Sequence, residues 1–311
     1  MKKVLLFILL TLLLVNSGCS TNISQDHYRD QEGDTSVSFE CSHGVSSFDP
    51  SKEHLTFNGA PIELSYTFQN GGIASNFGLL LFLNGEIQPF QIDSGDSDTI
   101  GVIELEAGEE KTFTITFQPV IGQVGEILHL HIVAIFDMMS DISTPTIGPL
   151  FYQAMSQAIP IDVYMNIDAD QNQESLVSDP RLIVKAGSIT SHDDNETIAS
   201  DMYMECQKNG SYMLGETDTI HIINGENQPV TFRMYAMVGN NLKPVAFEDG
   251  DSITIDSNSE QAIEFKLTSD KLASSNSQTL CFMAIPLFKD SNDYEGTMAY
   301  KTKTVSVNIN Y

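Results

Sequence analysis

Apolar and polar residues alternate with a period of two over much of the chain after residue 36. Between residues 61 and 68, for example, every second side chain is Ile, Leu, Tyr or Phe, so all four fall on one face of an extended strand. The same alternation recurs in residues 111–117, 253–255, 263–267 and 305–309. This pattern is typical of antiparallel strands with one buried and one solvated face, and no stretch has the periodicity of a three-turn amphipathic helix. The sequence therefore predicts an all-β fold.

The two halves of the chain repeat one another, which is the signature of a duplicated unit. The matching positions are Phe39-Glu40-Cys41 with Met204-Glu205-Cys206, Asn70-Gly71 with Asn224-Gly225, Gly85 with Gly239, and, at a constant offset of 150, Ile103 with Ile253, Ile115 with Phe265 and Ala134 with Ala284. We expect two copies of one β-sandwich, at residues 36–167 and 180–311, joined by an acidic linker at 168–179.

Each copy offers a succession of short strands separated by turn signals, the pattern of an immunoglobulin-like sandwich. The chain thus resembles the broad group of bacterial surface Ig-like domains over most of its length, although it has no Trp. A jelly roll is the alternative architecture. The runs at 77–84 and 128–136 are apolar on nearly both faces, as central strands are when a second layer covers them.

Residues 1–19 have the layout of a secretory signal: Lys2 and Lys3, then a twelve-residue apolar run, then Ser17-Gly18-Cys19. Twelve residues are too few to span a membrane. The ending resembles the bacterial lipobox, although Asn16 stands where Leu is usual. The resemblance implies a signal peptide at 1–18, a palmitate-bearing lipid on Cys19, and a location on the extracytoplasmic face of the cell membrane of a Gram-positive bacterium. Polar residues 19–35 would form the tether.

The chain is strongly acidic, with 42 Asp and Glu against 15 Lys and Arg, for a net charge of -27. Residues 36–167 carry 16 acidic and only 2 basic side chains. Nucleic acids are therefore excluded as partners, because their phosphates require Lys and Arg.

The linker segment contains Asp168, Asp170, Asn172 and Glu174, whose alternating oxygen ligands resemble the start of a Ca²⁺ loop. The Gly that such a loop needs at its sixth position is missing, so a solvated linker is the alternative. Apart from this calcium hypothesis, no cofactor is expected.

Two further sets of residues have ligand or cross-linking chemistry. His129 and His131 project from one face of a strand and could ligate a metal, or they could be core residues. Cys206 and Cys281 could form a disulfide, or remain free thiols.

The longest connection of the first copy, residues 137–159, is unusually rich in adaptable apolar side chains. It contains Met138, Met139, Leu150, Phe151, Tyr152 and Met155. The segment is either a partner-binding loop or a lid folded back on the protein itself.

Motifs of the common hydrolases, metalloproteases and nucleotide-binding enzymes are absent from the sequence. We therefore expect a non-catalytic, lipid-anchored surface protein that acts in binding, adhesion or as a scaffold, with a protein or envelope polymer as partner. The alternative is a carbohydrate-binding accessory lipoprotein of the cell envelope.

Overall fold

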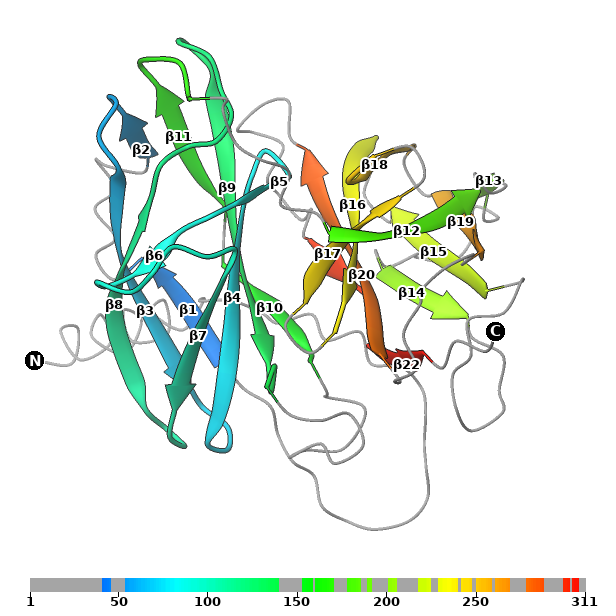
Figure 1. Ribbon diagram of the computed structural model, residues 1–311, viewed down its shortest axis with the longest axis horizontal. Helices are drawn as coiled ribbons and strands as arrows, with labels where there is room; N and C mark the ends of the chain where they lie inside the picture. The colour runs from blue at the N-terminus through cyan, green and yellow to red at the C-terminus, as the bar shows by residue number, and fades with distance from the viewer. Residues whose placement is uncertain are drawn as a thin grey trace, which may run out of the picture.

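The computed structural model describes the strand-forming body of the chain (Figure 1). The described residues are 41–45, 54–139, 153–158, 160–170, 178–185, 189–191, 201–205, 218–224, 229–239, 242–247, 250–258, 261–268, 278–287, 299–302 and 304–307. They form strands and turns, as the alternation predicted, and the fold is two tandem Ig-like β-sandwich domains. None of these described residues belongs to a helix that could cross a membrane.

The first sandwich consists of two facing sheets. One has the order β1 (Cys41–Val45), β3 (Ile62–Asn70), β8 (Glu110–Phe117) and β6 (Gln91–Ile92). The other has the order β2 (His54–Phe57), β11 (Ile161–Met165), β9 (Ile127–Phe136), β4 (Ser75–Leu83) and β5 (Glu86–Gln88), with β10 (Met155–Gln157) paired to β9 and β7 (Ile100–Leu105) paired to β4. All pairs are antiparallel except β2 with β11.

The core of the first sandwich follows directly from the alternation. On β3, Ile62, Leu64, Tyr66 and Phe68 are buried, while Glu63 and Ser65 on the opposite face are exposed. They pack against the inward residues of β4, β8 and β9 in one apolar cluster. Full burial of each large apolar side chain stabilises the fold by roughly 1.5–3 kcal/mol.

In the second sandwich the strands form one continuous hydrogen-bonded array. Its order is β14 (Asp201–Glu205), β15 (Asp218–Asn224), β19 (Gln261–Thr268), β12 (Ser178–Lys185), β17 (Lys243–Phe247), β16 (Val230–Val238), β20 (Gln278–Leu287) and β21 (Tyr300–Lys301), with β13 (Ile189–Ser191), β18 (Ile253–Ser257) and β22 (Val305–Val307) paired to β19, β16 and β20. Strand β12 connects the two layers, because it runs parallel to β17 at its start and antiparallel to β19 at its end. Pro180 lies where the register shifts, as expected for a residue without an N–H.

The repeat is visible at two asparagines. Asn70 ends β3 and Asn224 ends β15, and both are fully buried. Asn70 donates from Nδ2 to the carbonyl oxygens of Leu105 and Glu106, and Asn224 donates to those of Ser257 and Asn258. In each sandwich the asparagine therefore fastens one sheet to the turn that leaves the other, which confirms that the two residues are equivalent.

The expected constant offset of 150 is wrong for the middle of the repeat. Phe113 pairs with Tyr66, whereas Phe265 pairs with Ile220, so Phe265 takes the place of Phe113 and not that of Ile115. Their numbers differ by 152. A shift of two residues keeps every side chain on the same face of its strand, which is why the alternation concealed it.

The match between the first strands is also wrong. Val45 pairs with Tyr66, and Met204 pairs with Ile220, so Met204 occupies the place of Val45 and not that of Phe39. This shift, from 39 to 45, is again an even number of residues. Similar local sequence therefore misled the alignment while the face pattern was preserved.

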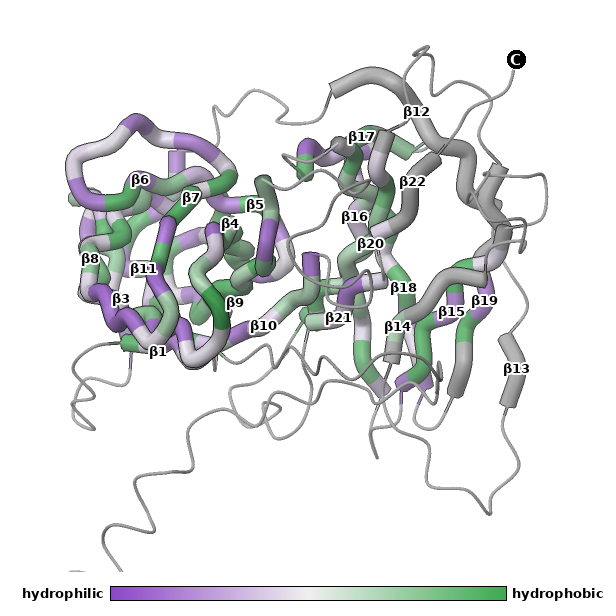
Figure 2. Tube along the Cα trace, turned by 90° about the horizontal axis from the view of Figure 1, so that it is seen from below, coloured by the Kyte–Doolittle hydropathy of each residue, from purple (hydrophilic) through white to green (hydrophobic). Residues whose placement is uncertain are grey.

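A third apolar cluster joins the two sandwiches. It brings together Leu80, Phe82, Ile87, Val133, Ile135 and Met138 of the first copy with Tyr235, Met237, Leu242, Cys281, Met283, Ile285 and Ala299 of the second. We call this set the joint. Both views of the molecule place β4, β9 and β10 beside β16, β17 and β20 (Figures 1 and 2). The joint explains the runs that are apolar on both faces: one face fills the sandwich core, and the other is covered by the second copy.

Candidate functional site

Polar contacts at the edge of the joint fix how the two copies meet. Tyr235 donates its hydroxyl proton to the Gly85 carbonyl oxygen at 2.8 Å and approaches Glu86 Oε2 at 3.2 Å. Arg233 forms an ion pair with Glu86. Burial, together with the charge of Glu86, raises the pKa of the Tyr235 hydroxyl, so this group stays a proton donor.

A second edge of the joint is held by glutamines of the first copy. The Ala299 N–H donates to Gln157 Oε1 at 2.9 Å, and the Thr304 hydroxyl donates to Gln153 Oε1 at 2.8 Å. These contacts and the Tyr235 contacts lie on different strands, so they oppose rotation of one sandwich on the other. The apolar joint and its polar edges favour a single rigid two-sandwich body.

The proposed partner-binding loop is divided by the structure. Met138 is 2% exposed and its side chain fills the space above Gly78, inside the joint. It is therefore not available to a partner, and the prediction is wrong for this residue. Met155 begins β10 and is partly buried against the joint, whereas Met139 is 60% exposed. Leu150, Phe151 and Tyr152 lie outside the described residues.

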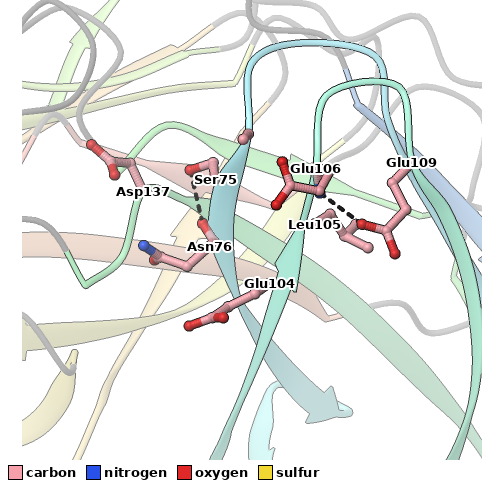
Figure 3. Close-up of a pocket in the computed structure, with 8 residues that line it drawn as sticks. Ser75, Asn76, Glu104, Leu105, Glu106, Glu109 and Asp137 are labelled. Atoms are coloured by element: carbon pink, nitrogen blue, oxygen red, sulfur yellow. Dashed lines mark hydrogen bonds between the residues drawn. The ribbon is translucent and has the colours of Figure 1, made fainter.

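An acidic pocket opens where this connection leaves β9 (Figure 3). Its volume is about 440 Å³. Carboxylates of Glu104, Glu106, Glu109 and Asp137 line it, with Ala74, Ser75, Asn76 and Leu105. One carboxylate oxygen of Glu109 is already engaged within the protein, because its Oε2 accepts a hydrogen bond from the Glu106 N–H at 2.7 Å. These carboxylates do not form a metal site: within the described part of the chain, no three His, Cys, Asp or Glu side chains are grouped so that they could hold a metal ion.

Asp168 and Asp170, the first two residues of the predicted calcium loop, have different surroundings. Asp168 Oδ1 accepts from the Val124 N–H at 2.8 Å, so this carboxylate caps the turn before β9. Asp170 is exposed. Asn172 and Glu174 lie outside the described residues, and calcium binding stays a prediction.

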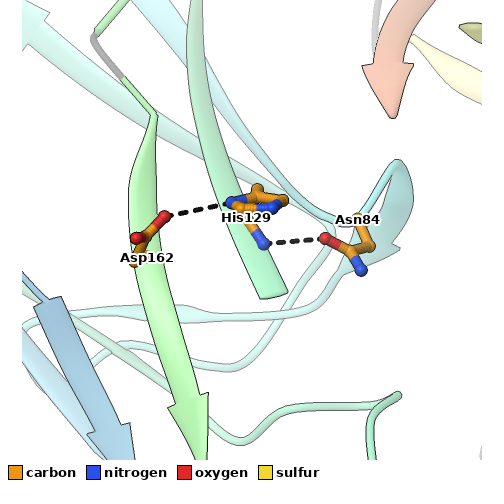
Figure 4. Close-up of polar contacts among 3 residues, drawn as sticks. All are labelled: Asn84, His129 and Asp162. Atoms are coloured by element: carbon orange, nitrogen blue, oxygen red, sulfur yellow. Dashed lines mark hydrogen bonds and ion pairs between the residues drawn. The ribbon is translucent and has the colours of Figure 1, made fainter. Parts of the chain in front are cut away.

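The two histidines of β9 belong to the outer face of their sheet, as their spacing predicted. His129 Nδ1 lies 3.0 Å from Asp162 Oδ1, and the His129 N–H donates to Asn84 Oδ1 at 2.7 Å (Figure 4). His131 is fully buried beside Phe82 in the region of the joint. Burial, aided by neighbouring His129, lowers the pKa of His131 to about 3, so it is neutral at physiological pH. The surroundings of His129 and His131 therefore fit the structural alternative, in which both are residues of the fold and not metal ligands.

A polar chain that the sequence analysis missed crosses the first core. His43 of β1 lies between two hydroxyls: its Nδ1 is 2.6 Å from the Tyr66 Oη, and its Nε2 is 3.2 Å from the Ser156 Oγ. All three side chains are buried. Burial lowers the pKa of His43 to about 4. The contacts tie β10 to the opposite sheet, and a histidine at an inward-facing position of β1 is the only signal that could have revealed them.

Cys281 is a free, buried thiol, so of the two alternatives for this residue, a disulfide with Cys206 or a free thiol, the structure has the free thiol. The reason is the direction of its side chain. Leu280 and Phe282 point into the core of the second sandwich, while Cys281 between them points into the joint. Burial raises the pKa of the Cys281 thiol, which keeps it protonated. Cys206 and Cys19, the predicted lipid attachment site, lie outside the described residues.

Comparisons with known proteins find only distant similarity. No family model matches the sequence, and no curated protein matches it. Among solved structures, the chain is similar to the CsuC–CsuE chaperone–tip adhesion subunit complex of Acinetobacter baumannii, with 9% identity over 85% of this chain and 98% of that chain and a TM-score of 0.23. It is also similar to the E. coli chaperone DraB, with 9% identity over 88% of this chain and 97% of that chain and a TM-score of 0.25. At such TM-scores, nothing about function or partners follows for this chain.

Proposed function

We propose that this protein is a non-catalytic, lipid-anchored scaffold on the extracytoplasmic face of a bacterial cell membrane. The observation that carries the proposal is the joint, since it buries the outer sheet faces of both copies against each other. Two sandwiches fixed in this way act as a rigid spacer that holds its free surfaces at a defined distance from the anchor.

The anchor is supported by the sequence around Cys19, and the orientation by charge. A first copy with 16 acidic and 2 basic residues is repelled by anionic headgroups and by an anionic wall. Such a body stands away from the membrane, with the lipid as its attachment.

The experiment follows a lipid label in two variants of the full chain. Cells that express the wild type and are fed radioactive palmitate should show label on the protein, and Cys19→Ala should abolish it. Cys281→Ala serves as the matched control, because a buried thiol is not a lipidation site. Label that persists in Cys19→Ala would contradict the anchor.

Binding is tested on the same cells by chemical cross-linking followed by identification of the linked proteins. Reproducible linking of a specific envelope protein supports the scaffold function. Among the side chains that the structure describes, Tyr164 is the one exposed large aromatic residue, so the carbohydrate alternative gains no support from a row of exposed rings.

A further inference from the structure

Exposed apolar side chains gather at one end of the first sandwich. Within the described residues, six large apolar side chains are exposed, and four of them lie at this end: Val124 at 63%, Ile127 at 41%, Tyr164 at 37% and Ile167 at 42%. We call these four the end patch. Single exposed apolar residues are ordinary on protein surfaces, but a contiguous group marks an interaction site.

Strand pairing and hydrogen bonds place the four residues of the end patch at the same end of the sheet. Tyr164 of β11 is paired directly with Ile127 of β9, so their side chains are neighbours on one face. Ile167 reaches the turn at Gly59, and Val124 is tied to Asp168, the residue after Ile167, by the hydrogen bond from its N–H. The His54 ring flanks the group, with its centroid 4.4 Å from that of Tyr164.

The end patch continues the face that forms the joint. Along β9, alternate residues on the outer face run from Ile127 through His129 and His131 to Val133 and Ile135. The second copy covers Val133 and Ile135, whereas Ile127 stays exposed. The same sheet face therefore has one apolar end that is already used in an interface and one that is open.

The charge around the end patch determines which kind of partner can bind there. The described residues between 41 and 167 include 12 acidic side chains and one basic side chain, Lys111. Glu126 lies between Val124 and Ile127 in the chain, Asp168 and Asp170 follow Ile167, and all three acidic residues are exposed. A second copy of this chain or an anionic lipid surface would be repelled at such a site, while a cationic partner would be attracted.

We propose that the end patch is a docking surface for a basic protein segment that carries apolar side chains. Its apolar residues pack on Ile127 and Tyr164, and its Lys or Arg side chains face the acidic surroundings. This inference rests on the proposed binding function and specifies the surface that performs it.

The test measures binding of a synthetic peptide of alternating Lys and Leu to the full chain in nanodiscs of neutral phosphatidylcholine. Nanodiscs without protein provide the background. Two altered peptides, one with Glu in place of Lys and one with Ser in place of Leu, separate the charge requirement from the apolar one. The variant is Ile127→Ser with Tyr164→Ser, and both positions are exposed, so the fold should survive.

Val102→Ser is the matched control, because Val102 is 46% exposed on the same sandwich. Val102 pairs with Gly78, which on its other side pairs with Ile135, eight residues along β9 from Ile127. At about 3.3 Å a residue, this control lies roughly 26 Å from the end patch.

The Lys-Leu peptide should bind the wild type, bind the double variant about tenfold more weakly, and bind Val102→Ser unchanged. Added salt should weaken binding, and hydrogen exchange should slow in residues 124–129 and 161–168. Equal binding to the wild type and the double variant would overturn the inference, as would equal binding of the Glu-containing peptide. A dimer of the wild type that the double variant cannot form would also overturn it, in favour of a second copy.

Failure of this inference is distinguishable from failure of the proposed function. If the cross-linked partner in cells is the same for the wild type and the double variant, the scaffold function stands and the end patch is not its surface.

Discussion

The Tyr235 hydroxyl donates a 2.8 Å hydrogen bond to the carbonyl oxygen of Gly85, two residues that lie in different sandwiches. Gly85 belongs to a two-residue Asn84-Gly85 turn with positive φ at both positions, of 45° and 75°. This geometry is the one that favours Asn-Gly in a hairpin, and it turns the Gly85 carbonyl toward the second copy. A local turn in one sandwich therefore supplies an acceptor for the other.

Tyr235→Phe should destabilise the protein by about 1 kcal/mol, because it leaves the Gly85 carbonyl without this donor while keeping the ring beside Phe82. Urea unfolding measures the change. Tyr164→Phe removes an exposed hydroxyl and should leave the free energy of unfolding unchanged. Equal effects of the two substitutions would contradict a role for the hydrogen bond.

Gly85→Ala and Gly108→Ala form a matched pair, because both glycines have φ of 75°. A Cβ at Gly85 would lie 2.5 Å from Leu287 Cδ2 of the second copy, whereas a Cβ at Gly108 meets nothing within 4 Å. Gly108→Ala should cost the backbone term alone, about 1–2 kcal/mol. Gly85→Ala should cost a further 1–3 kcal/mol, roughly, from overpacking. Thermal unfolding compares the two, and indistinguishable losses would show that the sandwiches do not meet at this turn.

Val133→Asp should uncouple the two sandwiches. Val133 is fully buried, but it belongs to the joint and to neither sandwich core. A buried carboxylate without an ion-pair or hydrogen-bond partner should weaken the association of the two sandwiches by several kcal/mol. The core of each sandwich keeps its own contacts. The expected result is two separate transitions in urea where the wild type has one. Val102→Asp, at an exposed position of β7, should retain the single transition.

Stability should fall between about pH 7 and pH 5, because His43 must stay neutral in the core. The folded-state pKa of His43 is about 4, below the ordinary value of 6.5. Between these values the unfolded chain binds more protons than the folded one, so acid favours unfolding. The His43 contribution to the free energy of unfolding should decrease by roughly 2 kcal/mol over this range.

The variant His43→Gln isolates the contribution of His43 to the pH dependence of the free energy of unfolding. Its free energy of unfolding should vary less with pH than that of the wild type, with the remaining slope due in part to His131, whose pKa is also lowered. Ser42→Ala changes an exposed, non-titrating residue of the same strand and should keep the wild-type slope. An unchanged slope in His43→Gln would mean that His43 binds as many protons in the folded chain as in the unfolded one, which would contradict the prediction.

Strand faces were predictable from residue order, since a period of two assigns each side chain to one face whatever the partner strand is. For this reason the alternation predicts that Leu64, Tyr66 and Phe68 face the core, and all three are buried. The strand pairing was less predictable, because shifts by an even number of residues preserve the faces, and the place of Phe265 was therefore assigned two residues away.

The sequence by itself determined an all-β duplicated chain, its acidic charge, and the presence of strands with two apolar faces. What covers the second face was decided by the tertiary structure alone, because apolar burial is non-directional and any apolar layer satisfies it. Only the assembled sheets show that the second sandwich is that layer and that Met138 and Cys281 point into the joint. They also show that Ile127 and Tyr164, on the same sheet face of the first sandwich, stay exposed in the end patch.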